Sequence, residues 1–173
     1  MTAGRHVNTL SQSWGTPPKY VNAIKRFWGG SIGLDPCSNE YSVVHADIEF
    51  RLPEKDGLIE EWTSSTIFVN PPYGADVIAL IPVAPNTAHW KKFVFGQASS
   101  ICFLYDTRLR FLENGKDTGK GAPMACCLVY WGNEKDRFIE HFLDYGATVD
   151  ISNLLRCEIG IERKEQKLLF ATY

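Results

Sequence analysis

The chain has 173 residues, of which 45% are hydrophobic and 22% are charged, and its formal net charge is −2. A composition this close to the globular average excludes disordered and fibrous classes, and the length predicts one domain with a core of its own. The slightly negative charge gives no global argument for a nucleic-acid partner, so any such contact requires a local basic strip.

Cysteine usage and apolar runs bear on the compartment. The five cysteines form no C-x-x-C pair, and most lie in apolar runs such as "MACCLVYW", which favours reduced core thiols in an intracellular protein over disulfides or a zinc site. His45, His89 and His141 have no metal-ligand spacing. No apolar run has the length of a membrane span, and residues 1–13 lack the hydrophobic centre of a signal peptide. We expect a soluble, cytoplasmic protein without a metal or a membrane partner, built as a flexible N-terminal tail (residues 1–13) and one domain (residues 14–173).

The first predicted element is a helix over residues 17–27. Thr16 is an N-cap candidate, Pro17 suits the first turn, and apolar side chains recur at helical spacing until a Gly-Gly stop. "SIGLDPC" then predicts a short buried strand that ends at Asp35, because Pro36 cannot continue a ladder from a central position. A carboxylate is therefore expected at the carboxyl end of a strand.

Further apolar runs predict the remaining elements. "STIFVN" and "SSICFLY" predict strands, and the unbroken apolar run "DVIALIPV" is typical of a strand buried on both faces. "RLRFLE" and "MACCLVYWG" predict two strands joined by a long hairpin loop, "NGKDTGKG". "RFIEHFLDYG" predicts a helix that a capping-box-like pair, Asn133 and Asp136, opens, with Phe138, Phe142 and Leu143 on one face. "ATVDIS" is compatible with one more strand.

Strands that alternate with helices predict an open, mostly parallel α/β sheet. Ligands of such sheets bind beyond the carboxyl ends of the strands. Asp35 and Asn70 both fall at such ends, so this edge is the expected site.

The stretch "FVNPPYG" fixes the backbone where the chain leaves a strand. Pro71 and Pro72 pin their own φ angles and restrict the residues before them. Asn70 offers a side-chain carbonyl, Pro71 a main-chain carbonyl and Tyr73 a flat face. Two acceptors and a stacking plate suit a planar ring with an exocyclic amine, such as an adenine rotated out of a duplex. The alternative is that Pro-Pro-Tyr-Gly only makes a turn between strands.

An aromatic amine is a weak nucleophile because its lone pair is delocalised into the ring. Two hydrogen bonds from the amine protons to carbonyl oxygens would favour a pyramidal nitrogen with a directed lone pair. A methyl group held in line with that lone pair could then be transferred by positioning and electrostatics, without a strong base.

The segments around this motif resemble those of a known enzyme family. "FVNPPYG" is similar to motif IV of amino-methyltransferases that use S-adenosylmethionine. The order "WGTPPKYVNAI", "GLDPCSNE", "DGLIEEW", "FVNPPYG", "ALIPVAPNTAHW" and "RLRF" resembles the phage-encoded DNA N-6-adenine methyltransferase family over residues 14–132.

The resemblance implies a Rossmann-like methyltransferase fold with a mostly parallel central sheet, flanking helices and a C-terminal antiparallel hairpin. It also implies methyl transfer from S-adenosylmethionine to N6 of a flipped adenine in double-stranded DNA. The implied catalytic motif is Asn70, Pro71, Pro72 and Tyr73, and the implied cofactor contacts are Trp14, Thr16, Pro17, Asp35, Cys37, Asp56 and Asn70.

Each of these assignments has a structural alternative. Thr16 would serve only as a helix cap, Asp35 and Asp56 only as turn residues, and Trp14 and Trp62 only as core aromatics. Asp35 stands at a strand end and Asp56 stands before the next strand, and these positions favour a functional role for both residues. In the family, the residue that matches Asp56 accepts a hydrogen bond from the adenine amino group of the cofactor.

The chain departs from the family pattern at two places. "LDPCSNE" lacks the Phe-x-Gly-x-Gly glycines of many methyltransferases, and Glu40 and Asp47 are the candidates for the ribose hydroxyls. Only six residues separate Asn70 from Val77, whereas a parallel crossover usually takes roughly a dozen residues. Either these strands pair antiparallel through a hairpin or a loop and helix of the family are missing; we favour the second explanation because "ADVIALIPVAPNTAHW" resumes the family pattern.

Basic residues in the second half are candidates for contacts with the DNA backbone. They are Lys91, Lys92, Arg108, Arg110, Lys116 and Lys120. The loop "ENGKDTGKG" would fold onto phosphates or would be a solvated hairpin tip. Two alternatives to DNA adenine methylation stay open: a catalytically degenerate methyltransferase-fold protein that binds DNA or a host protein, and a methyltransferase of protein glutamine side chains, for which a glycine-rich motif I is usual.

Overall fold

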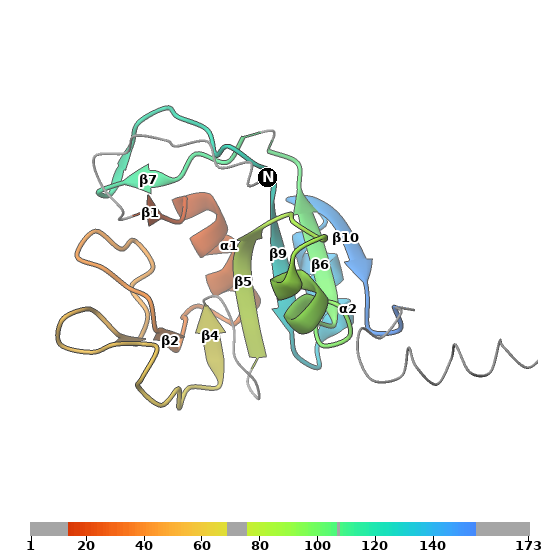
Figure 1. The fold of residues 1–173 in the computed structure, drawn as a ribbon, viewed down its shortest axis with the longest axis horizontal. Helices are drawn as coiled ribbons and strands as arrows, with labels where there is room; N and C mark the ends of the chain where they lie inside the picture. Colours follow the sequence, from red (N-terminus) through yellow and green to blue (C-terminus); the bar gives the residue numbers. More distant parts are fainter. Residues whose placement is uncertain (1–13, 69–75, 107, 155–173) are drawn as a thin grey trace, which may run out of the picture.

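A seven-stranded mixed sheet forms the body of the molecule, and a second, three-stranded sheet lies beyond one of its edges (Figure 1). The computed structural model describes residues 14–68, 76–106 and 108–154. The strand order of the large sheet is β10-β6-β9-β5-β4-β2-β3. The predicted α/β class is confirmed at this level.

The bounds of the elements follow. The large sheet contains β2 (Leu34–Asp35), β3 (Ile48–Glu49), β4 (Thr66–Phe68), β5 (Asp76–Pro82), β6 (Ser100–Leu104), β9 (Cys126–Trp131) and β10 (Gly146–Asp150). The small sheet contains β1 (Trp14–Gly15), β7 (Leu112–Glu113) and β8 (Lys116–Asp117). The helices are α1 (Pro18–Phe27), a π-helical turn η1 (Trp90–Val94) and α2 (Lys135–Phe142).

The large sheet is mostly parallel in strand direction. β3, β2, β4 and β5 pair in parallel, and β6 points the same way because both β5 and β6 pair antiparallel with β9. The other edge strand, β10, runs antiparallel to β6. Five of the seven strands therefore share a direction, and the carboxyl ends of β2, β4, β5 and β6 meet along one edge.

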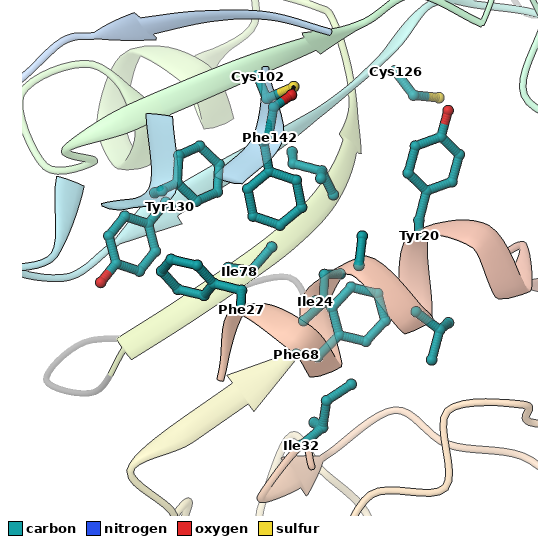
Figure 2. Packing of buried hydrophobic residues seen from close by; sticks show 14 of the residues in the cluster. Tyr20, Ile24, Phe27, Ile32, Phe68, Ile78, Cys102, Cys126, Tyr130 and Phe142 are labelled. Carbon is teal, nitrogen blue, oxygen red and sulfur yellow. Dashed lines mark hydrogen bonds between the residues drawn. The ribbon is translucent and has the colours of Figure 1, made fainter. Parts of the chain in front are cut away.

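The two faces of this sheet are covered unequally. α1 and α2 cover one face, and their aromatic residues pack together with β5, β6 and β9 in the largest core cluster (Figure 2). In that cluster Phe138 stacks on Tyr130 with ring centroids 5.0 Å apart, and Phe27 meets the edge of Tyr130 at 5.5 Å. Only η1 covers the opposite face in the described parts of the chain, through Trp90 and Val94.

Both predicted helices form, but neither is capped as expected. Pro17 is the N-cap residue of α1, so Thr16 does not cap it, and the helix is held by its buried face instead. Glu134 precedes α2 without a side-chain cap, so the capping-box pair Asn133 and Asp136 is wrong. Packing against the sheet therefore compensates for the missing caps. None of the helices in the described ranges is long and apolar enough to cross a membrane.

The predicted apolar face of α2 is correct only in part. Phe138 and Phe142 are fully buried, whereas Leu143 is 54% exposed. Leu143 directly follows Phe142 and keeps helical backbone angles, and consecutive helix residues point about 100° apart, so its side chain turns away from the buried face.

The pairing of β4 with β5 corrects the prediction for this region. The two strands are parallel, with Phe68 opposite Ile78, although only seven residues (69–75) separate them. The antiparallel alternative is therefore wrong. The expectation that a parallel connection needs about a dozen residues is also wrong here. β4 has only three residues, so the start of β5 lies only about 7 Å back along the strand direction and about 5 Å to the side of the end of β4. Seven residues reach roughly 24 Å.

The segment after β6 does not form the predicted strand pair. "RLRFLE" contributes only Leu112–Glu113 to a strand, and this strand pairs with β1 and with β8, not with β9. β9 lies between β5 and β6 instead. The antiparallel part of the large sheet thus joins β6, β9 and β10, and the small sheet lies near the carboxyl edge.

Candidate functional site

The expected site lies where β2 and β4 end. Asp35 is the last residue of β2 and Phe68 is the last residue of β4, and the two strands are neighbours in the sheet. Phe68 is also the last described residue before the motif; Asn70, Pro71, Pro72 and Tyr73 lie outside the described residues. The structure therefore fixes the strand that leads into the motif.

A cavity of about 250 Å³ opens at this edge. Thr16, Asp35, Cys37, Phe68 and Phe111 line it, together with residues of the loop that follows β2. Three of the side chains assigned to the cofactor thus meet beside the strand that leads to Asn70, although Thr16 lies far from the other two, Asp35 and Cys37, in the sequence. Because Phe111 precedes β7, which pairs with β1, the small sheet supplies a wall of the cavity.

Asp35 is the carboxyl group that lines this cavity at the end of β2. Its side chain is 6% exposed, and its Oδ1 accepts a hydrogen bond of 3.1 Å from the Cys37 N–H. Burial raises the pKa of the Asp35 carboxyl to about 6, although the Cys37 N–H acts in the opposite direction. No described residue donates a hydrogen bond to Oδ2, so this oxygen can accept one from a ligand.

A second cavity, of about 780 Å³, adjoins the first. Cys37 and Asn39 line both, and Glu40 and Asp56 line the second. Asp56 Oδ1 accepts a hydrogen bond of 2.9 Å from the Leu58 N–H, as in the turn alternative. Asp56 therefore closes a turn and also lines a cavity. Its role as a turn residue does not exclude a role in binding a ligand.

Two contacts hold the Asp56 loop against the loop that follows Asp35. A Cβ atom on Gly57 would lie 1.8 Å from the carbonyl oxygen of Pro36, so only glycine permits this approach. The indole N–H of Trp62 donates a hydrogen bond of 2.8 Å to the Gly57 carbonyl. Trp62, which sequence reasoning treated as a core aromatic, thereby also positions the loop of Asp56.

The two ribose candidates are in different surroundings. Glu40 lines the larger cavity, whereas Asp47 accepts a hydrogen bond of 3.2 Å from the Ser31 hydroxyl and lines neither cavity. Ser38 and Glu49 were not predicted as site residues from the sequence. Among the described residues, the buried Oγ of Ser38 has no hydrogen-bond partner, and neither has the buried Oε1 of Glu49.

These two unpartnered atoms lie near Asp35. Ser38 lines the larger cavity, and Glu49 stands opposite Asp35 in the β2–β3 register. Glu49 is not among the residues that line either cavity. Polar atoms of this kind need a partner when buried, and of these two residues only Ser38 lines a cavity.

The remaining predicted cofactor residues are placed differently. Cys37 is exposed, unlike Cys102, Cys126 and Cys127, which are buried. Burial of its sulfur atom and the nearby carboxylates of Asp35 and Asp56 raise the pKa of the Cys37 thiol. Pro17 lines a third cavity, described below. Trp14 lies in β1, where it pairs with Glu113.

The predicted basic residues lie in three places. Lys91 and Lys92 belong to η1, which covers one face of the sheet. Arg108 and Arg110 flank Leu109, which packs in the α1–α2 cluster on the other face. Lys116 lies in β8, and Lys120 follows it as an exposed residue. The structure therefore does not gather the six side chains in one strip.

No family model matches the chain, and neither the curated proteins nor the solved structures compared with it contain a significant match. The arguments for a function therefore rest on the residues and their geometry. In the described ranges, no group of three or more His, Cys, Asp and Glu side chains is placed to hold a metal ion.

Proposed function

We propose that the protein transfers a methyl group from S-adenosylmethionine to the exocyclic N6 of adenine in DNA, on a Rossmann-like scaffold. One observation carries the proposal: Thr16, Asp35 and Cys37, which the resemblance assigns to the cofactor, line one cavity beside Phe68, two residues before Asn70. In open α/β sheets this carboxyl edge is where ligands bind.

The residues present fit a cofactor with many hydrogen-bond donors. Asp35 Oδ2 and the buried Ser38 Oγ are polar atoms without a partner among the described residues, and Asp56 and Glu40 add carboxylates along the adjoining cavity. A donor bound at Asp35 would lower the pKa of a carboxyl that burial has raised. S-adenosylmethionine, when bound, supplies an electrophilic methyl group.

The chain's own part in the chemistry is orientation. We propose that the Asn70 side-chain carbonyl and the Pro71 main-chain carbonyl accept the two amine protons, and that Tyr73 stacks on the adenine ring. Pro72 restricts the backbone between them. These roles require no strong base, and they agree with a site that contributes position and fixed dipoles.

The test is incubation of the purified protein with radiolabelled S-adenosylmethionine and unmethylated DNA, beside an Asn70→Ala control. We expect label in N6-methyladenine after nucleoside digestion and its loss in the control. Label in protein instead of DNA would favour glutamine methylation. Protein that binds no S-adenosylmethionine would contradict the enzyme and favour a degenerate binding protein.

A further inference from the structure

A third cavity, of about 550 Å³, lies between the start of α1 and the segment that follows β6. Pro17, Lys19 and Tyr20 line one side, and Arg108, Arg110 and Asp117 line the other. This cavity, called here the α1 cavity, is separate from the two cavities of the candidate cofactor site, with which it shares no lining residue.

The α1 cavity lies back to back with the cavity at Asp35. Thr16 and Phe111 line the Asp35 cavity, whereas their chain neighbours Pro17 and Leu112 line the α1 cavity. Gly15 pairs with Leu112 in the small sheet. Gly15 lines the Asp35 cavity and its strand partner Leu112 lines the α1 cavity, so the β1–β7 pair borders both cavities.

Positive charge is in excess in the α1 cavity. Three cations, Lys19, Arg108 and Arg110, face two carboxylates, Asp106 and Asp117. Lys19 Nζ lies 3.3 Å from an Asp106 oxygen, and Arg110 Nη1 lies 3.9 Å from an Asp117 oxygen.

Arg108 is the one of these three cations that takes part in neither ion pair. No carboxylate in the described ranges pairs with Arg108. The excess charge of the cavity is thus located on this guanidinium, whose planar fork of donors matches a phosphate group.

The backbone and side chain of Arg108 are held in place before any ligand arrives. Its Nη1 donates a hydrogen bond of 3.0 Å to the Ala122 carbonyl, and the Ala122 N–H donates one of 2.7 Å to the Leu109 carbonyl. A Cβ on Gly121 would lie 2.3 Å from the Arg108 Cβ, so this glycine permits the close packing. An arginine fixed in this way loses little entropy when it binds an anion.

We propose that the α1 cavity binds a backbone phosphate of the DNA substrate, with Arg108 as the main contact. The inference rests on the proposed function, because it names the surface along which the substrate of that site lies. The DNA backbone then follows the outer surface of the small sheet, on the side of the molecule away from η1. Lys91 and Lys92 are correspondingly not part of the DNA contact.

Binding of a short fluorescent DNA duplex, measured by anisotropy between about 50 and 200 mM salt, tests this proposal. Arg108→Gln is the main variant, because it removes the charge and keeps a polar amide, although its side chain is too short to replace the Nη1 hydrogen bond to the Ala122 carbonyl. We expect about tenfold weaker binding and a salt slope reduced by about one. Arg108→Lys should give an intermediate affinity, and Lys92→Ala on η1 should bind as the wild type does.

Several results would overturn the inference. In the first, Arg108→Gln binds DNA with the affinity and salt slope of the wild type. In the second, Lys92→Ala loses DNA binding but Arg108→Gln does not, and in the third the wild type itself binds no DNA. Thermal stabilisation by inorganic phosphate that depends on Arg108, without DNA binding, would also overturn it and would indicate a site for free phosphate. Unchanged melting temperature and S-adenosylmethionine affinity in Arg108→Gln exclude misfolding as the cause of weaker binding.

The same DNA-binding and methyl-transfer measurements distinguish a failure of the phosphate contact from a failure of the proposed enzyme activity. DNA binding that depends on Arg108, without any methyl transfer, would contradict the enzyme and support the phosphate contact. Methyl transfer to DNA with an unchanged affinity in Arg108→Gln would support the enzyme and contradict the phosphate contact.

Discussion

Gly57 lies so close to Pro36 that a Cβ atom on the glycine would stand 1.8 Å from the proline carbonyl oxygen. This approach joins the loop of Asp56 to the loop that follows Asp35, and both loops line the larger cavity. The obstacle is main-chain atoms, which cannot rotate away as a side chain does. The position of Asp56 relative to Asp35, the two carboxylates proposed to contact the cofactor, thus depends on the absence of a side chain at Gly57.

The first prediction concerns this contact. Gly57→Ala forces the two loops apart, and we expect a loss of about 2 kcal/mol or more in the free energy of unfolding, as is usual for overpacking against a fixed backbone. Affinity for S-adenosylmethionine should fall by at least about tenfold. Urea unfolding and calorimetry measure the two effects. Leu58→Ala, in the same loop but 90% exposed, is the matched control and should leave stability unchanged.

The second prediction concerns the pH dependence of stability. Because the folded state raises the Asp35 pKa from 3.8 to about 6, the folded chain binds this proton more tightly than the unfolded chain does. The contribution of Asp35 therefore lowers the free energy of unfolding as the pH rises from about 4 to about 6, by about 3 kcal/mol in all.

Asp35→Asn removes this contribution and can keep the acceptor for the Cys37 N–H. We expect the variant to be more stable than the wild type at about pH 8 and to lack this part of the pH dependence. The same variant should bind S-adenosylmethionine at least about tenfold more weakly, because the charged acceptor is lost. Asp144→Asn, at an exposed position, should keep the wild-type profile. A variant with the wild-type profile and affinity would remove Asp35 from the site.

The third prediction uses the exposed thiol that borders both cavities. Cys37 is exposed, whereas Cys102, Cys126 and Cys127 are buried, so iodoacetamide should modify Cys37 selectively in a Cys157→Ser background. The raised pKa of the Cys37 thiol predicts slower modification at neutral pH than for a free thiol, since the thiolate is the nucleophile.

S-adenosylmethionine should protect Cys37 from this reaction, and the modified protein should no longer bind the cofactor. Peptide mass spectrometry measures the first effect and calorimetry the second. Equal modification rates with and without saturating cofactor would contradict a cofactor site at Cys37.

The fourth prediction concerns the hydrogen bond from the Tyr20 hydroxyl to the Asp106 carboxylate. This bond is the main reason why the Asp106 pKa lies below its ordinary value. The bond therefore stabilises the fold above the ordinary pKa of the carboxyl, and the contribution is lost as the pH falls through the lowered value. Because the Asp106 side chain is 43% exposed, we expect Tyr20→Phe to cost about 1.5 kcal/mol at neutral pH, the lower end for a bond to a charged group.

Urea unfolding at neutral and acidic pH measures this effect. The difference between Tyr20→Phe and the wild type should shrink in acid, as Asp106 becomes protonated. Tyr105→Phe, at a neighbouring residue that is 69% exposed, is the control and should match the wild type throughout. A difference that does not depend on pH would contradict the role of the Asp106 charge.

Local pattern was sufficient to predict most elements of the large sheet. "DVIALIPV", "SSICFLY" and "MACCLVYWG" are continuously apolar or nearly so, and each forms a strand; β5 and β9 are largely buried on both faces, whereas Phe103 of β6 is exposed. α1 also starts within one residue of its expected position, because proline suits only the first turn of a helix. The caps failed because side-chain hydrogen bonds of this kind compete with packing that the sequence does not reveal.

Tertiary structure alone decided which distant residues meet. Asp35 and its place at a strand end follow from "GLDPC", since proline stops a central strand. The cavity at Asp35 is also lined by Phe111, from the segment before β7, and by Thr16, from the segment after β1. These two residues meet there because β1 pairs with β7, and this pairing involves only two residues of each strand. Pairings this short leave no periodic signal in the sequence. The same pairing separates Arg108 from the cavity at Asp35. The sequence thus determined which chemical groups are present, and the packing of the small sheet against the carboxyl edge decided which of them share a site.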